Sequence, residues 1–447
     1  FMGRKRNSLK VVRRRGLGIC MALALALPFT GCGDAGMQAK DLMKEQTGQQ
    51  GLAADQDKGQ DPIQEIGKDM GQEAPGEDLL YVGNAEGAFA DFGLKLLCNN
   101  LEDKENVLVS PLSVLSALAM TANGARGGTL TQMEQVFGIS LGELNPYLRD
   151  LREGLPEGEK YRLDMANAIW FRDADFFQAE QAFLDINREY YGAGLYQAPF
   201  DDTTLQEINS WVEDHTAGMM KDILVRSRDE EVMYLLNALA FDGEWQEIYK
   251  DFQVREEDFT LEDGTARKVD MMWSEESVYL SDDQAEGFLK YYADRKYAFA
   301  ALLPEEGLAV EEYEASLTGE KLCDILAHAQ DIPVWARIPR FESEYGVELG
   351  QTLRQMGMED AFDEERADFS GMGHSDRGNL YISRVIHKTY IAVNDRGTRA
   401  GAASVVAPAD GGAAMEIKEV YLDRPFFYMI VDCENCMPVF MGVMMEP

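Results

Sequence analysis

After about residue 80 the hydrophobic positions first follow a helical period. Ser110 stands before Pro111, the usual order of a helix cap and a first helical residue, and apolar residues then recur on one face until Asn123 and Gly124. A second helical pattern opens near Thr204 and turns three side chains inward: Ile208, Trp211 and Val212. Both segments are predicted to be helices of one compact unit.

Two later segments have patterns typical of strands. Residues 232–241 form a nearly continuous apolar run, as expected for a strand that is covered on both faces. Between residues 383 and 393 alternate positions form one face of a long strand: Val385, His387, Thr389, Ile391 and Val393. Because helices come mostly early and strands mostly late, the pattern predicts an α+β fold with a large mixed sheet.

The first 31 residues have the pattern of an export signal. Basic residues occur between positions 4 and 15, and the run from Leu17 to Phe29 is apolar apart from Gly18. The next residues, Thr30-Gly31-Cys32, resemble the lipobox of bacterial lipoproteins. We therefore expect residues 1–31 to be removed and Cys32 to carry a lipid anchor at the bacterial cell surface, with a plain secreted product as the alternative.

Residues 32–80 are predicted to be a flexible acidic tether. This segment is rich in Gln, Gly, Asp, Glu and Lys and has no periodic apolar face. Residues 55–61 faintly resemble a calcium loop, but the glycine and the closing acid are out of register, so we interpret them as solvated linker. The compact domain is predicted to span residues 81–447.

Composition and charge exclude several functions. The chain has 447 residues, 45% of them hydrophobic, which allows a sizeable core and excludes wholesale disorder. Its 42 Lys and Arg face 79 Asp and Glu, so the formal net charge is -37. A body this acidic repels phosphates, and we expect no nucleic-acid partner.

Residues with catalytic chemistry do not assemble into a known motif. The chain has 4 histidines, none with a partner at zinc-ligand spacing, and it contains neither a nucleophile elbow nor a phosphate loop. His387 lies on an apolar strand face and is interpreted as a hydrogen-bonded core residue. Cys433 and Cys436 lie between two apolar runs, which favours a hairpin turn whose thiols are able to pair outside the cell. We expect no catalytic residue, no metal, no cofactor and no enzyme activity.

A series of short motifs runs along residues 82–447. The segments are 106–114 (NVLVSPLSV), 166–171 (ANAIWF), 208–212 (INSWV), 216–218 (TAG), 236–238 (LNA) with 241–245, 339–341 (PRF), 367–370 (ADFS), 387–388 (HK), 423–426 (DRPF) and 440–442 (FMG). In kind and in order these motifs resemble those of serpins, a family of protease inhibitors, and together they identify the chain as a member.

The resemblance implies a fold and a mechanism. The serpin fold has about nine helices around three β-sheets and an exposed reactive loop, and its active state lacks one strand of the main sheet. A target protease attacks the loop as a substrate, and the loop then inserts into that sheet and traps the covalent acyl-enzyme. The resemblance also implies a polar cluster, the shutter, that gates the opening of the sheet: Ser110, Ser113, Asn237 and His387.

The hinge of the loop matches a segment rich in small residues: Asp395, Gly397, Thr398, Arg399, Ala400, Gly401, Ala402 and Ala403. A segment that must enter between two paired strands needs small side chains, because half of them face the core after entry. Three residues depart from the family pattern: Asp395 replaces glutamate, Arg399 stands where glutamate is common, and Pro408 has no backbone donor for a central strand. Arg399 and Pro408 raise the question of how efficiently the inserted loop traps a protease.

The position of the cleaved bond follows from counting. Serpins that inhibit usually place it fourteen residues after the hinge glycine, which implies the bond between Gly411 and Gly412. Neighbouring positions stay open: Ala409, Asp410, Ala413, Ala414 and Met415. No Lys or Arg occurs from Ala400 to Ile417, which disfavours a trypsin-like target.

Small residues around the bond favour an elastase-like or subtilisin-like serine protease as the covalent partner. A cysteine protease remains an alternative, and Met415 at the bond would favour a chymotrypsin-like enzyme. We expect a monomer. The second hypothesis for the whole chain is a serpin that no longer inhibits and acts as a substrate or a binding protein.

Overall fold

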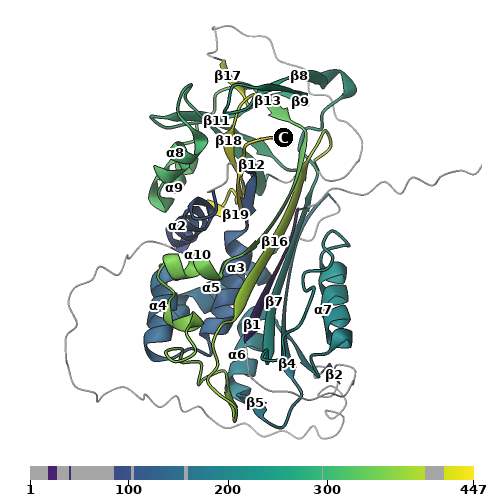
Figure 1. Cartoon of the computed structure of the whole chain (residues 1–447). Helices are drawn as coiled ribbons and strands as arrows, with labels where there is room; N and C mark the ends of the chain where they lie inside the picture. The colour runs from purple at the N-terminus through teal and green to yellow at the C-terminus, as the bar shows by residue number, and fades with distance from the viewer. Residues whose placement is uncertain are drawn as a thin grey trace, which may run out of the picture.

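The computed structural model describes residues 19–27, 40–41, 85–101, 105–155, 160–293, 295–397 and 417–447, and of the first two segments it describes the backbone alone. This part of the chain forms an α+β fold with nine α-helices, three large β-sheets and a two-stranded ribbon (Figure 1). The expected number of helices and the mixed architecture are confirmed.

The helices lie mostly in the first half of the domain. Their bounds are α2 Ala85–Cys98, α3 Pro111–Ala122, α4 Gly127–Phe137, α5 Leu141–Glu153, α6 Gln181–Tyr191, α7 Asp202–His215, α8 Val310–Ala315, α9 Gly319–Ala327 and α10 Gly350–Gln355, with short 3-10 turns η1 Asp251–Gln253 and η2 Asp360–Phe362. Ser110 caps α3 by accepting a hydrogen bond from the Ser113 amide, so the predicted helix begins where its cap signal stands.

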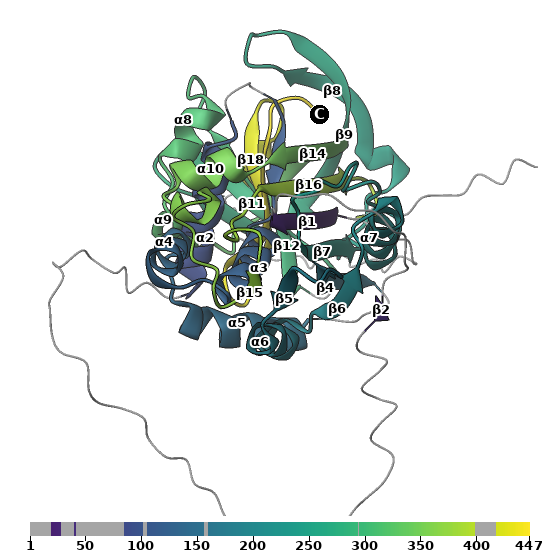
Figure 2. The same cartoon turned by 60° about the horizontal axis from the view of Figure 1, so that its bottom comes forward.

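The central sheet has seven strands in the order β14-β16-β1-β7-β4-β6-β2. Their bounds are β14 Phe341–Glu348, β16 Arg384–Val393, β1 Ile19–Leu27, β7 Met233–Gly243, β4 Tyr161–Arg172, β6 Gly194–Ala198 and β2 Lys40–Asp41. Figure 2 shows these strands stacked in that order, with α7 on one side. The two predicted strands are confirmed as β7, which is buried from Met233 to Phe241, and β16, whose odd positions are all buried.

The two other large sheets lie toward the top of Figure 1, whereas β5 of the two-stranded ribbon lies at the bottom. A six-stranded sheet has the order β10-β11-β12-β18-β19-β3, and a four-stranded sheet has the order β17-β13-β9-β8. The bounds are β3 Val107–Val109, β8 Val254–Thr260, β9 Ala266–Glu276, β10 Val278–Ser281, β11 Ala285–Tyr291, β12 Tyr297–Pro304, β13 Val334–Pro339, β17 Lys418–Tyr421, β18 Phe426–Asp432 and β19 Met437–Met444, and a ribbon pairs β5 Phe177–Ala179 with β15 Gly373–Ser375.

The central sheet separates two apolar clusters. The larger one joins α3 and the six-stranded sheet to the odd residues of β7, and the smaller one packs α7 against the even residues Tyr234, Leu236 and Ala240. Ile208 and Val212 of α7 are buried as predicted, whereas Trp211 is half-buried and stacks on His215 with 4.2 Å between ring centroids. Each face of β7 is therefore covered, which explains its continuous apolar run.

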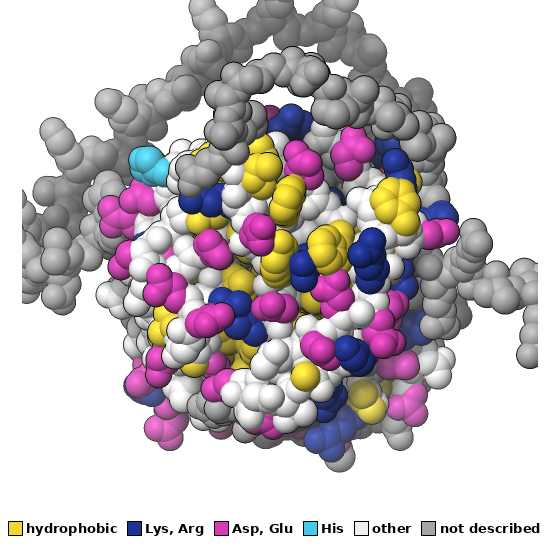
Figure 3. All heavy atoms as spheres, turned by 90° about the horizontal axis from the view of Figure 1, so that it is seen from above, with side chains coloured by type: hydrophobic (Ala, Val, Ile, Leu, Met, Phe, Trp, Pro, Cys, Tyr) yellow, Lys and Arg dark blue, Asp and Glu magenta, His cyan; other side chains and the backbone are white. Residues whose placement is uncertain are grey.

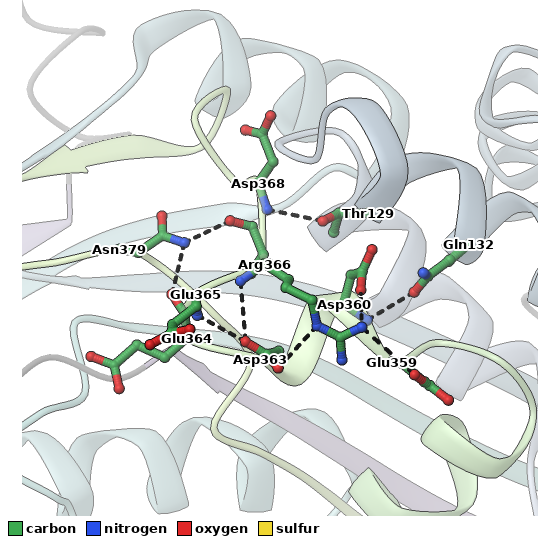
Figure 4. A network of polar contacts seen from close by, with 11 residues as sticks. Thr129, Gln132, Glu359, Asp360, Asp363, Glu364, Glu365, Arg366, Asp368 and Asn379 are labelled. Carbon is green, nitrogen blue, oxygen red and sulfur yellow. Dashed lines mark hydrogen bonds and ion pairs between the residues drawn. The ribbon is translucent and has the colours of Figure 1, made fainter.

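The segment between η2 and β15 is tied to α4 by a polar network (Figure 4). The amide of Asp368 donates to Thr129 at 2.9 Å, and the amide of Asp360 donates to Gln132 at 2.8 Å. The guanidinium of Arg366 contacts three acids on its own segment: Glu359, Asp360 and Asp363. Backbone contacts to α4 thus hold this loop, and Arg366 neutralises part of its negative charge.

The predicted turn at Cys433 and Cys436 is confirmed, because it joins β18 and β19 as a hairpin. Among the described residues, none of the four cysteines Cys98, Cys323, Cys433 and Cys436 forms a disulfide. Cys436 has a positive φ of 52°, which is typical of a tight turn.

Candidate functional site

The site is built around one strand position in the middle of the central sheet, which we call the slot: the position between β7 and β16. In this structure β1 occupies it and runs antiparallel to both neighbours. Its nine residues face Phe241 to Met233 on one side, and seven of them, Cys20 to Ala26, face Tyr390 to Arg384 on the other. Since β7 and β16 are both antiparallel to β1, the slot accepts a strand that enters from the end where β16 stops, at Val393.

The four residues predicted for the shutter meet at the middle of the slot. Asn237 on β7 and His387 on β16 are opposite the same β1 position, and both are fully buried. The N-terminus of α3 reaches both strands, because the Ser110 amide donates to His387 Nε2 at 3.3 Å and the Ser113 hydroxyl donates to Asn237 Oδ1. Helix α3 therefore binds the two strands that border the slot.

Two further groups complete this cluster. The Asn237 amide donates to Asn167 Oδ1 on β4 at 2.8 Å, and the Ser110 hydroxyl donates to the carbonyl of Val439 at 2.6 Å. Asn167 lies inside the 166–171 motif but was not among the residues predicted for the shutter. Its polar side chain in an apolar strand was the available signal.

Burial determines the protonation of His387. Desolvation lowers its pKa to about 3, so the imidazole is neutral at physiological pH. Its Nε2 accepts from the Ser110 amide, which leaves the proton on Nδ1, and Nδ1 has no hydrogen-bond partner among the described residues. A neutral ring with one satisfied nitrogen suits a structural role, as the sequence analysis interpreted it.

The hinge begins with a tight turn over residues 394–397. The Gly397 amide donates to the carbonyl of Asn394 at 3.3 Å, and Gly397 has a φ of 75°. A Cβ at this position would lie 2.4 Å from the Trp245 nitrogen and 2.6 Å from the Gly243 carbonyl oxygen. Only glycine fits here, because the turn needs a left-handed residue that also packs directly against β7.

Trp245, just beyond β7, holds this turn. Its indole Nε1 donates to the Asn394 carbonyl at 2.7 Å, and its backbone amide donates to Arg396 at 3.3 Å. Asp395 pairs with Arg340 at 2.8 Å, so the aspartate that replaces the usual glutamate has a cationic partner. Trp245 and Arg340 lie in two of the motifs that resemble serpins, but no local pattern predicts that they meet at the hinge.

A buried lysine supports Trp245 from behind. Lys290 Nζ lies 5.4 Å from the Trp245 ring and 4.4 Å from the Tyr249 ring, and it pairs with Glu276 at 2.7 Å. Burial alone lowers the pKa of Lys290, but the neighbouring Glu276 carboxylate and Tyr249 raise it above its ordinary value. The ammonium stays charged, and this part of the hinge platform is held by ionic and cation–π contacts.

Several predicted site residues lie outside the described residues. They are Cys32, the hinge residues Thr398, Arg399, Ala400, Gly401, Ala402 and Ala403, and every candidate for the cleaved bond: Ala409, Asp410, Gly411, Gly412, Ala413, Ala414 and Met415. Of the hinge, the structure describes Asp395 and Gly397.

Comparison with known proteins settles the family. The family model described as "Serpin (serine protease inhibitor)" matches residues 87–447. The chain belongs to the serpin family. Human serpin B9 is 32% identical over 78% of this chain and 95% of its own length, and an uncharacterized serpin-like protein of Thermococcus kodakarensis is 31% identical over 84% and 87%. Serpins are generally protease inhibitors and not enzymes.

Solved structures agree with this assignment. The native state of tengpin, a thermophilic serpin, is 41% identical, has a TM-score of 0.77 and covers 92% of this chain and 100% of tengpin. Tengpin in the latent state gives a TM-score of 0.71 over 81% of this serpin. Human thyroxine-binding globulin, at 24% identity and a TM-score of 0.71, shares the fold. Within the described residues, no helix is both long and apolar enough to cross a membrane.

Proposed function

We propose that this serpin is exported, held at the bacterial surface through a lipid on Cys32, and irreversibly inhibits serine proteases of the elastase-like or subtilisin-like kind. The observation that carries the proposal is that the chain direction after the hinge turn matches the strand direction that the slot accepts. The turn over residues 394–397 reverses the chain at the end of β16, and the slot accepts a strand that runs antiparallel to β16 and β7.

The hinge contacts define a register for insertion. Gly397 is bonded to Asn394 and also forms an antiparallel bridge to Glu244, the residue after β7. If each pairing is continued by one residue at a time, position 400 faces Ile391 and Phe241, and position 404 faces His387 and Asn237. The β1 strand has this same pairing, with one of its residues facing His387 and Asn237 together.

This register explains the small residues of the hinge. Directly paired residues of an antiparallel sheet point to the same face, and the odd residues of β7 point to the larger core. Positions 400, 402, 404 and 406 therefore enter that core. Their residues are Ala400, Ala402, Ser404 and Val406, which have no charge and little bulk.

The same register accommodates the two unfavourable departures. In this register Arg399 would face Asp242, a half-exposed residue of opposite charge at the upper end of β7. Pro408 would face Met233, which in this structure pairs with Leu27, the last residue of β1. A missing amide there affects only the end of the inserted strand, where a proline costs least. Neither residue prevents the eight preceding positions from entering.

The chemistry is that of an interrupted peptide hydrolysis. The protease serine attacks the carbonyl carbon of the cleaved bond, an ester forms, and the amine of the next residue leaves with a proton. Water then competes with insertion of the freed loop, which carries the attached protease across the molecule. Insertion is favoured because the loop, added as a strand to the central sheet, gains backbone hydrogen bonds and apolar burial in the slot.

The target class follows from the loop composition. Residues 400–417 contain no Lys or Arg to pair with an acid at the base of a trypsin-like pocket. Ala and Gly fit the shallow pockets of elastase-like and subtilisin-like enzymes. Cysteine proteases and, through Met415, chymotrypsin-like enzymes are the next classes to test.

The proposal is tested by mixing the purified serpin with elastase and with subtilisin, followed by denaturing gels. We expect a covalent complex that survives SDS, together with a small C-terminal fragment whose first residue is Gly412. A cleaved chain beside fully active protease would instead show a substrate that does not inhibit. N-terminal sequencing of the fragment identifies the bond in either case.

A further inference from the structure

The four-stranded sheet has an outer face built from aligned aromatic and charged side chains. Two rows cross the strands β9, β13 and β17: Glu275, Trp335 and Glu419 in one, and Trp273, Arg337 and Tyr421 in the other. The alternate residues of β13 (Val334, Ala336 and Ile338) are buried on the inner side. The two rows therefore lie on the outward face, which Figure 3 views from above.

The second row is rigid. The guanidinium of Arg337 lies between two rings, 3.7 Å from the centroid of Trp273 and 3.7 Å from that of Tyr421. Glu257 of β8 fixes both partners, because it accepts from Arg337 at 2.9 Å and from the Trp273 indole at 2.9 Å. Such a stack loses little conformational entropy when another protein binds it.

The first row presents an apolar side chain between two acids. Trp335 is 46% exposed, the largest exposed aromatic of this sheet among the described residues. Glu275 and Glu419 face it from the neighbouring strands, and Glu419 is held by the Tyr421 hydroxyl at 2.8 Å. Trp, Tyr and Arg are the residues that most often dominate binding energy in protein interfaces.

An acidic hollow continues this face at β17. It has a volume of about 630 Å³, and Glu419 and Tyr421 form part of its wall together with Glu286, Glu305 and Glu306. The surface beside Trp335 therefore combines an apolar centre with acids on the two neighbouring strands, and the nearby guanidinium of Arg337 is already paired with Glu257. A partner that complements it has an apolar recess bordered by Lys or Arg.

The position of the face relative to the reactive loop identifies the partner. Ile417, 43% exposed, directly precedes β17, and Glu419 is paired beside Trp335. Residues 412–417 span at most about 20 Å when extended. A protease domain of about 200 residues has a radius of gyration of about 17 Å, so a protease bound at the proposed bond lies against this end of the molecule.

We propose that the outer face of β9, β13 and β17, centred on Trp335, is a second docking surface for the target protease. This inference rests on the proposed function and adds to it. The loop supplies the bond that is attacked, and the face selects proteases with a basic, recessed surface beside their active site. Docking accelerates the first encounter and has no part in loop insertion.

The test compares association rates. For a protease that the wild-type serpin traps, the second-order rate constant is measured from progress curves for the wild type, Trp335→Ala and the double variant Glu275→Lys/Glu419→Lys. We expect each variant to lose about tenfold or more in rate, with unchanged stoichiometry of inhibition and unchanged melting temperature. Val225→Ala is the control, since this exposed apolar residue lies before β7, away from the β9–β13–β17 face.

The outcomes separate the two proposals. If the wild type forms no SDS-stable complex, the proposed function fails and the docking surface fails with it. If complexes form and both variants keep the wild-type rate, only the docking surface is overturned. A variant that raises the stoichiometry of inhibition, or a wild-type dimer that Trp335→Ala dissociates in size-exclusion chromatography, also contradicts it, because the face then serves insertion or self-association.

Discussion

Burial of His387 makes the stability of the fold depend on pH, because desolvation lowers the pKa of its imidazole in the folded state. Its ring is fully buried beside the slot, with a pKa of about 3, whereas the unfolded chain has an ordinary value of 6.5. Below pH 6.5 the unfolded chain takes up a proton that the folded imidazole does not bind. The stabilisation is therefore complete above pH 6.5 and is lost progressively as the pH falls toward 3.

Replacement of His387 by Gln should remove this dependence, since an amide still accepts from the Ser110 amide but does not titrate. Between pH 7.5 and 5.5 the wild type should lose about 1.4 kcal/mol of unfolding free energy relative to the variant. Urea titration at the two pH values measures the difference. Burial raises the pKa of Glu314 to about 7, which acts in the opposite direction, but it is present in both proteins and cancels.

A difference between wild type and variant that stays constant from pH 7.5 to 5.5 would mean that His387 titrates in the folded state as it does in the unfolded chain. The added proton would then occupy Nε2, which accepts from the Ser110 amide, and that hydrogen bond would be lost.

At the scale of elements, the burial of the residues that border the slot determines which side chains the hinge can contain. The register through Gly397 sets position 402 opposite Leu239 and Thr389, both fully buried, and position 399 opposite the half-exposed Asp242. The inserted loop would therefore tolerate a charged side chain at position 399 but not at position 402.

Ala402→Arg should convert the inhibitor into a substrate. A guanidinium forced into the core without a partner costs several kcal/mol, which slows insertion until water releases the protease. Arg399→Ala is the matched control and should trap normally, because the side chain that it removes points to the outer side of the sheet. The measurement is the ratio of SDS-stable complex to cleaved chain with elastase, and normal trapping by Ala402→Arg would contradict the register.

At the scale of the whole molecule, two segments of this chain fit the slot. The structure places Ile19–Leu27 there, whereas the resemblance to serpins assigns it to the loop after Gly397. The nine positions taken by β1 are the ones that the hinge register assigns to residues 400–408. Both segments cannot occupy the slot at once, so removal of residues 1–31 would leave it open for the loop.

A chain that begins at Cys32 should therefore trap proteases faster than a chain that keeps residues 1–31. We also expect cleavage of the loop to raise the melting temperature of the shorter chain strongly, because an inserted strand adds hydrogen bonds and apolar burial. Progress curves and thermal unfolding of the two chains measure these effects. Equal trapping rates would show that β1 does not compete with the loop, and equal melting before and after cleavage would contradict insertion.

The elements themselves were predictable from local sequence. Ser110 and Pro111 marked the start of α3, the continuous apolar run marked β7 and the alternating residues marked β16. These signals depend on neighbouring residues in the chain, since caps and hydrophobic periods are local properties. The motif order was sufficient to assign the family and to group the four shutter residues.

The partners of the hinge depended on the tertiary structure alone. Gly397, Trp245 and Arg340 are far apart in sequence and meet only because β7, β14 and β16 lie in one sheet. The same holds for Arg337 between Trp273 and Tyr421, which come from three strands. Sequence determined which segments are helices, strands and small-residue hinge, whereas register between distant strands decided which side chains face one another, because that register is fixed by packing over the whole core.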